Sequence, residues 1–71
     1  MGVNSREIGQ RIRALRIKNK MTQQELAYAV DVSLNTVGKI ESGIRMPSVD
    51  MFVMISSTFG VTLDFLILGR K

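Results

Sequence analysis

The sequence contains no cysteine and no histidine. The absence of cysteine excludes disulfides and thiolate metal sites, and the absence of histidine removes the commonest metal ligand and the commonest general base. Catalysis would then depend on carboxylates, lysine or Tyr28, and the six acidic residues are scattered without an evident convergent pair. We therefore expect no enzyme activity, no metal site and no cofactor.

Long apolar segments are also missing. The longest apolar stretch, Val61 to Leu68, is interrupted by Asp64, and the first residues contain no apolar core of the length found in signal peptides. These observations predict a protein that is neither exported nor inserted into a membrane. We expect a cytoplasmic location.

Acidic residues are fewer than basic ones, and the charge is unevenly distributed. Ten Lys and Arg against six Asp and Glu give a net charge of +4, which favours a polyanionic partner without requiring one. Six of the bases lie between residues 6 and 20, whereas residues 46–69 contain none. Hydrophobic residues make up 45% of the 71 positions. A chain of this size buries roughly 60% of its unfolded surface, so we expect one domain of modest stability over residues 1–71.

Capping residues and apolar spacing predict five short helices and no strand. In the first, Ser5 is the expected N-cap, and Ile8, Ile12 and Leu15 recur at spacings of four and three, which gives one buried stripe. This helix should end near Asn19.

The second helix begins at a capping box. The hydroxyl of Thr22 is placed to accept from the third helical N–H, and Glu25 to accept from the N–H of Thr22. Leu26, Ala27 and Val30 form the inner face of this helix. It should be short, because a break and a new N-cap follow directly.

The third helix is predicted to begin at Ser33, after a break at residues 31–33, and to end at Ser42–Gly43. Val37 and Ile40 point inward in this register. The remaining faces of the helix are therefore available for a ligand.

Proline and glycine delimit the last two helices. Residues 45–47 form a connection, since Pro47 disfavours the helical conformation in the residue before it. Gly60 separates the fourth helix from the fifth. The N-caps expected are Ser48 and Thr62, the fourth helix should bury Val49, Phe52, Ile55 and Phe59, and the last turn contains Leu63 and Leu66.

Two short capped helices joined by about three residues are the components of a helix-turn-helix. The same corner also occurs as a plain packing element in many helical bundles, so the geometry alone leaves both interpretations open.

Several segments resemble the phage repressor and Cro type of helix-turn-helix. They are Met21-Thr-Gln-Gln-Glu-Leu-Ala27, Val32-Ser33, residues 37–41 and Gly43, together with the Ile8–Arg16 helix, the Glu41–Pro47 segment and the Gly60–Leu66 segment. The resemblance covers nearly the whole chain. It implies an all-α, compact five-helix bundle, a lambda-repressor-like DNA-binding domain whose second and third helices, residues 22–41, bind the major groove of double-stranded DNA.

The resemblance also implies roles for individual residues. The base-contacting positions are Ser33, Leu34, Asn35 and Lys39, and the phosphate-contacting positions are Gln23, Ser42 and Arg45. An asparagine can bond N6 and N7 of adenine together, a leucine can contact a thymine methyl group, and a lysine can reach guanine or phosphate. Each of these side chains can alternatively be merely solvated.

Two further positions acquire a role from the resemblance, and a third breaks a local rule for helices. Arg16 and Glu41 match an ion pair that fixes the orientation of the third helix. Gly38, in mid-helix, is explained either by close approach to another backbone or to DNA, or by an exposed site that tolerates glycine.

The sequence departs from the family pattern in two ways. Lys20 and Asp31 stand where many relatives have glycine, so Asn19 and the Asp31 turn should adopt less favourable backbone angles. Met51, Val53, Met54 and Phe65 are apolar where polar residues are usual.

Met51 and Met54 should face away from the core, and exposed apolar clusters usually bind a partner. We therefore expect a homodimer through the fourth and fifth helices. The residues expected near its axis are Met51, Met54, Phe65 and Leu68.

Symmetry then predicts an inverted-repeat operator with half-sites roughly 34 Å apart. The predicted function is a sequence-specific transcriptional regulator, with a repressor favoured over an activator. The alternative is an antitoxin or another interaction module whose apolar C-terminal face binds a heterologous protein. An oligonucleotide selection repeated with Asn35→Ala would separate base reading from phosphate binding.

Overall fold

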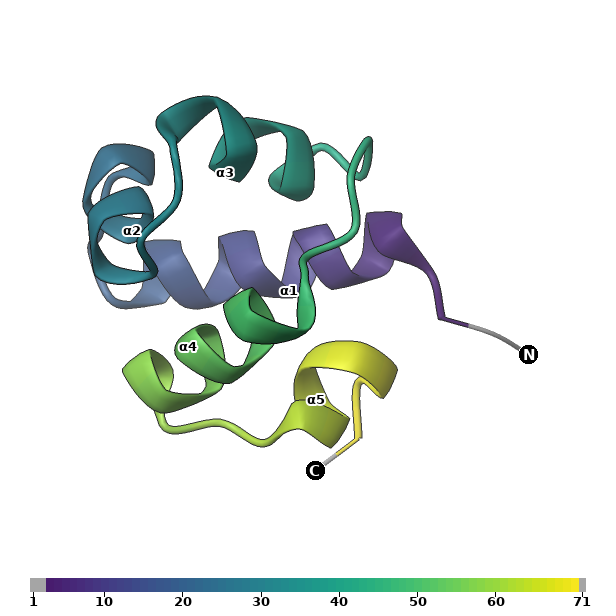
Figure 1. Ribbon diagram of the computed structural model, residues 1–71. Coiled ribbons are helices and arrows are strands. Elements are labelled where there is room, and N and C mark those ends of the chain that lie inside the picture. The colour runs from purple at the N-terminus through teal and green to yellow at the C-terminus, as the bar shows by residue number, and fades with distance from the viewer. Residues whose placement is uncertain (1–2, 71) are drawn as a thin grey trace.

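Five helices form a small bundle in the computed structural model, which describes residues 3–70 (Figure 1). They are α1 (Ser5–Lys18), α2 (Gln23–Ala29), α3 (Leu34–Glu41), α4 (Val49–Phe59) and α5 (Leu63–Leu68). Residues 3–70 contain no strand, and the all-α prediction is confirmed over that range. None of the helices found there is long and apolar enough to cross a membrane.

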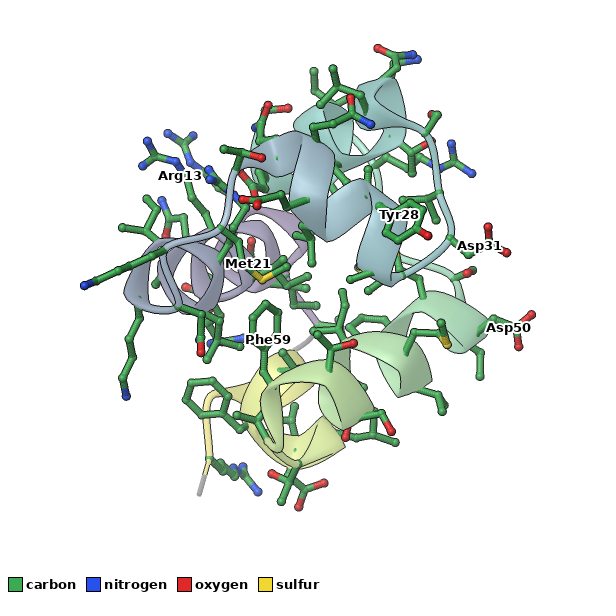
Figure 2. The ribbon with its side chains drawn as sticks, turned by 90° about the vertical axis from the view of Figure 1, so that its left-hand side faces the viewer. Arg13, Met21, Tyr28, Asp31, Asp50 and Phe59 are labelled. Carbon is green, nitrogen blue, oxygen red and sulfur yellow. The ribbon has the colours of Figure 1, made fainter. Side chains whose placement is uncertain are left out.

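Helix α1 crosses the middle of the bundle, with α3 on one side of it and α4 and α5 on the other (Figure 1). Its apolar stripe supplies Ile8 and Ile12, both fully buried, to a core that all five helices share. Phe59 and Met21 close the edge of this core from α4 and from the segment before α2 (Figure 2). The buried apolar residues are Ile8, Ile12, Leu26, Ala27, Val30, Val37, Ile40, Met51, Phe52, Ile55 and Leu66.

The predicted N-caps are confirmed for four helices. The hydroxyl groups of Thr22, Ser33, Ser48 and Thr62 each accept from the third backbone N–H of the helix that follows. Thr22 and Glu25 complete the capping box, with the N–H of Thr22 donating to Glu25 Oε1 at 2.8 Å.

The predicted cap of α1 is wrong by one residue. Asn4 is the N-cap, and its Oδ1 accepts from the N–H groups of Arg6 and Glu7 at 2.9 and 3.1 Å. Ser5 is the first helical residue, and its hydroxyl donates to the carbonyl of Gly43 at 2.9 Å. Asparagine and serine are about equally good caps, so local preference does not choose between them. The choice of Asn4 is accompanied by the bond from Ser5 to Gly43, which is distant in sequence.

The register of α4 also differs from the prediction. Val49 is 78% exposed instead of buried, and Met51, expected to face outward, is only 3% exposed. Nearly every residue in the first two turns of α4 is apolar, so the hydrophobic pattern does not define a single inner face. Met51, Phe52 and Ile55 form that inner face.

Two non-glycine residues have positive φ, Lys20 at 57° and Asp31 at 58°. These are the two positions at which the sequence lacks an expected glycine. Asn19, at φ −92°, does not carry the strain that was predicted for it. The unfavourable angles fall on Lys20 and Asp31 because each is the left-handed residue that follows a helix.

Replacing Lys20 by glycine is therefore expected to stabilise the protein. Removing the left-handed strain gains roughly 1–2 kcal/mol, and the added freedom of the unfolded chain takes back roughly 0.4–1 kcal/mol. Urea denaturation should show a gain of about 0.5 kcal/mol or more, whereas the control Ala14→Gly, at an exposed position inside α1, should lose about 1 kcal/mol. A decrease in stability for Lys20→Gly would contradict this interpretation.

Candidate nucleic-acid interface

Helices α2 and α3 meet at a short, closed turn. Val30 is the C-cap of α2, and the N–H of Val32 donates to the carbonyl of Ala27 at 3.0 Å, which returns the chain toward α3. Val37 and Ile40 anchor the inner side of α3 in the core without any exposure. The turn and the buried side together hold α3 in a fixed position on the bundle.

The outer side of α3 is not covered by the rest of the described chain. Ser33, Asn35 and Lys39 are exposed, and Leu34 is 46% exposed although it is apolar. Figure 1 shows α3 at the edge of the molecule, with its far side facing solvent. The four positions predicted to contact bases thus lie at or near one accessible surface.

Thr36 and Gly38 border this surface and are partly buried. The hydroxyl of Ser33 accepts from the N–H of Thr36 at 3.1 Å and shares a second hydrogen bond with the Thr36 hydroxyl at 2.9 Å. A Cβ atom on Gly38 would have no heavy atom within 4 Å outside its own helix turn and its chain neighbours. Packing within the protein therefore does not require glycine at position 38.

A polar network joins α1, α2 and α3. Arg16 donates from Nε to Glu41 Oε2 at 2.7 Å and from Nη2 to Glu41 Oε1 at 3.0 Å, so the ion pair is bidentate. The third donor, Nη1, reaches the carbonyl of Met21 at 2.8 Å. Gln23 Nε2 also donates to Glu41 Oε1, at 3.0 Å. Glu41 at the end of α3 is thereby held by two other helices.

The ion pair lies in a poorly solvated position. Glu41 is only 8% exposed. The hydrogen bond to Glu41 raises the pKa of Arg16, while desolvation acts in the opposite direction. The ion pair expected between Arg16 and Glu41 is present in the structure, and the bond from Gln23 is an addition that the sequence did not suggest.

The three residues predicted to contact phosphate lie at the two ends of the motif. Gln23, at the start of α2, is half-buried because of its bond to Glu41. Ser42 and Arg45 follow α3 and are exposed, and the hydroxyl of Ser42 donates to the carbonyl of Lys39 at 3.0 Å. That carbonyl also accepts from the N–H groups of Ile44 and Arg45, so the loop after α3 is ordered by its own hydrogen bonds.

Comparison with known families decides between a DNA-binding motif and a plain packing corner. A model of the helix-turn-helix family matches residues 12–66, which include α2, α3 and most of the core. The chain belongs to this family, of the Cro and phage repressor type. The predicted lambda-repressor-like fold is confirmed.

Two curated relatives of this helix-turn-helix protein are transcription or control proteins. The transcriptional activator BcrR of Enterococcus faecalis is 34% identical over 65 residues, which are 92% of this chain and 32% of the activator. The control protein C.BamHI of Bacillus amyloliquefaciens is 36% identical over 67 residues, covering 87% of this chain and 83% of that protein. The chain thus spans only about a third of the activator's length.

Solved structures agree in fold. The P22 c2 repressor, determined in complex with a synthetic operator, has a TM-score of 0.84 and 30% identity, and the match covers 89% of this chain and 96% of the repressor chain. The controller protein C.AhdI of Aeromonas hydrophila has a TM-score of 0.81 and 25% identity, with the same coverage. The relatives are thus a transcriptional activator, a repressor and two control proteins.

The residues predicted at a dimer axis are only partly on the surface. Met54 and Leu68 are exposed, Phe65 is half-buried against the core, and Met51 lies inside it. Met51 therefore offers no surface to a partner. Val53, one of the apolar departures from the family pattern, is exposed on α4, and Leu63 is exposed on α5.

Proposed function

We propose that this protein regulates transcription by inserting the outer side of α3 into the major groove of double-stranded DNA. The observation that carries the proposal is the exposed face of α3 above a fully buried inner face. Such a helix can enter a groove without disturbing its own packing. The bidentate pair of Arg16 with Glu41 supports this function, because it ties the end of α3 to α1.

Base reading is assigned to four side chains. Asn35 can pair with N6 and N7 of an adenine, and the exposed Leu34 can cover the methyl group of a neighbouring thymine. Lys39 lies one turn further along α3 and addresses guanine or phosphate. Ser33 already uses its hydroxyl within the helix start, so it is the weakest candidate of the four.

Backbone contacts are assigned to Gln23, Ser42 and Arg45, at the two ends of the motif. The side-chain amide of Gln23 carries two hydrogens, and Glu41 uses one of them. The second remains for a phosphate oxygen. Arg45 is exposed on the ordered loop after α3, where its guanidinium can pair with phosphate in a bidentate manner.

We infer a homodimer from the apolar surface of α4 and α5. Met54 and Leu68 are exposed on these helices, as are Val53 and Leu63, and exposed apolar patches are typical of interfaces. Phe65 lies at the edge of this surface. A two-fold axis would place two copies of α3 on an inverted repeat, with half-sites roughly 34 Å apart on one face of the duplex.

Repression is the proposed outcome of binding. The P22 c2 repressor matches over 96% of its chain, whereas the BcrR activator matches over 32% of its length. A protein that occupies an operator can block transcription by occlusion alone. The expression of a reporter behind the selected operator should therefore fall when this protein is supplied.

An oligonucleotide selection tests base reading. The wild type should enrich an inverted repeat, and Asn35→Ala should lose the preference for adenine at one position of each half-site, worth about 1–3 kcal/mol, or roughly 5- to 150-fold. The control Gln24→Ala, an exposed change on α2, should leave the preference intact. Uniform weakening on all sequences by Asn35→Ala would reassign this residue to phosphate.

A second candidate function is favoured by an open groove of about 520 Å³ beside α4. Val53 and Met54 line it, and Asp31 and Asp50 stand at its edges on the side of the molecule opposite to Arg13 (Figure 2). An interaction module such as an antitoxin would bind a heterologous protein here. A single stoichiometric partner in a pull-down, lost in Met54→Glu, would support this function, and a wild type that retains no partner would exclude it.

A further inference from the structure

Arg11 joins α1 to the last helix. Its Nη1 donates to the carbonyl of Leu66 at 3.1 Å and to the carbonyl of Ile67 at 3.2 Å. Both carbonyls belong to the last turn of α5. Carbonyls in the last turn of a helix have no N–H partner within the helix, because the helix does not continue beyond them. The guanidinium thus acts as a C-cap delivered from a helix 55 positions earlier in the sequence.

Gly69 and Glu7 are two further neighbours of the Arg11 guanidinium. Gly69, at φ 74°, ends α5, and a Cβ atom there would lie 2.8 Å from Nη2 of Arg11. Glu7, one turn earlier on α1, approaches the same Nη2 at 3.5 Å. The absence of a side chain at Gly69 leaves room for the guanidinium at the end of α5.

Helix α5 needs such an external attachment. It has six residues, too few to be stable by itself in water. Leu66 anchors it in the core and is the only fully buried residue of α5. The two hydrogen bonds from Arg11, together with the half-buried Phe65 and Ile67, fix the direction in which its exposed side points.

Helix α1 therefore carries two arginines that hold different helices. Arg16 holds α3, which reads DNA in the proposed function, and Arg11 holds α5, which supplies Leu63 and Leu68 to the proposed dimer surface. The two arginines are roughly 7.5 Å apart along the axis of α1. The position of α5 relative to α3 sets the distance between the two copies of α3 in a symmetric dimer.

We propose that Arg11 is a positioning residue that sets the half-site spacing accepted by the dimer. The inference rests on the proposed homodimer. Arg11 touches neither bases nor phosphate in this role, so its loss should change the spacing preference and the strength of dimerisation and leave the base preference within each half-site unchanged.

The test uses the full chain and a library in which the two selected half-sites are separated by spacers of different lengths. Wild-type protein should enrich one spacer. Arg11→Met should accept neighbouring spacers and dimerise about tenfold or more weakly in sedimentation equilibrium, with the same bases selected in each half-site. Arg13→Met removes the same charge from an exposed site on α1 and should behave as wild type.

Arg11→Lys serves as the second variant. If Arg11→Met does not fold, Arg11→Lys tests whether Arg11 sets the half-site spacing. Lysine keeps the charge but lacks a planar group with fixed donors, so it should recover part of the wild-type dimerisation and only part of the spacing preference. Wild-type spacing and dimerisation in a folded Arg11 variant would overturn the inference. A wild type that is monomeric and selects single half-sites would instead overturn the proposed dimer, and this role of Arg11 with it.

Discussion

Gly9→Ala is expected to remove about 3 kcal/mol of stability or more. Gly9 is buried at the crossing of α1 with α3, and a Cβ atom there would overlap the backbone carbonyl oxygen of Ile40 and lie 3.0 Å from that of Glu41. Both neighbours are backbone atoms and cannot rotate away, so the two helices must separate. Overpacking of this kind generally costs about 1–3 kcal/mol and sometimes more.

The loss would be a large part of the total stability. A domain of ordinary stability has roughly 0.05–0.15 kcal/mol per residue, and this chain has 71 residues. Urea denaturation followed by circular dichroism measures the effect. The control is Gly38→Ala, the same substitution at an open position in α3, which should gain about 0.5–1 kcal/mol. Equal stability of the two variants would contradict the close packing of α1 against α3.

Glu41→Gln is expected to cost about 3–5 kcal/mol. The side chains of Arg16 and Glu41 are 11% and 3% exposed, so removal of the carboxylate leaves a guanidinium in a poorly solvated site. The pKa of Arg16 is raised by its hydrogen bond to Glu41. Glu41→Gln removes the main cause of this raised pKa and leaves the desolvation of the guanidinium, which acts in the opposite direction.

The double variant Arg16→Met with Glu41→Leu separates the effect of losing the whole ion pair from the effect of losing one partner. Replacement of a buried pair by apolar side chains is often nearly neutral, so the double variant should recover most of the stability that Glu41→Gln loses. Glu7→Gln is the matched control, because the Glu7 side chain is 62% exposed and lies 3.5 Å from its partner Arg11. Its effect on stability should stay below about 1 kcal/mol. A double variant as unstable as Glu41→Gln would disprove this account of the pair.

Local signals in the sequence predicted most of the fold. Four N-caps, the capping box and the end of α4 at Gly60 depend on residues within a few positions of one another, and the physics of helix ends is local. The exposed face of α3 followed from the apolar spacing of Val37 and Ile40. The choice of Asn4 over Ser5 did not, because Ser5 is engaged by Gly43, 38 positions away.

The polar contacts of the site were less predictable. The family resemblance implied the pair of Arg16 and Glu41, but no pattern in the sequence connects Gln23 with Glu41 or Arg11 with the carbonyls of α5. Such bonds depend on how helices cross, and single-sequence periodicity does not encode crossing geometry. The misplaced Met51 has a simpler cause, since an apolar run such as residues 51–55 fits more than one inner face.

The central claim is that the outer side of α3 enters the duplex. Leu34 tests this claim most directly, because its side chain is exposed. Its methyl groups should give well-resolved NMR signals in a protein of 7.9 kDa. In a complex with the selected duplex, nuclear Overhauser effects should connect the Leu34 methyl groups with base protons or thymine methyl groups. A complex in which Leu34 shows no contact with DNA, while α1 or α5 does, would contradict the account.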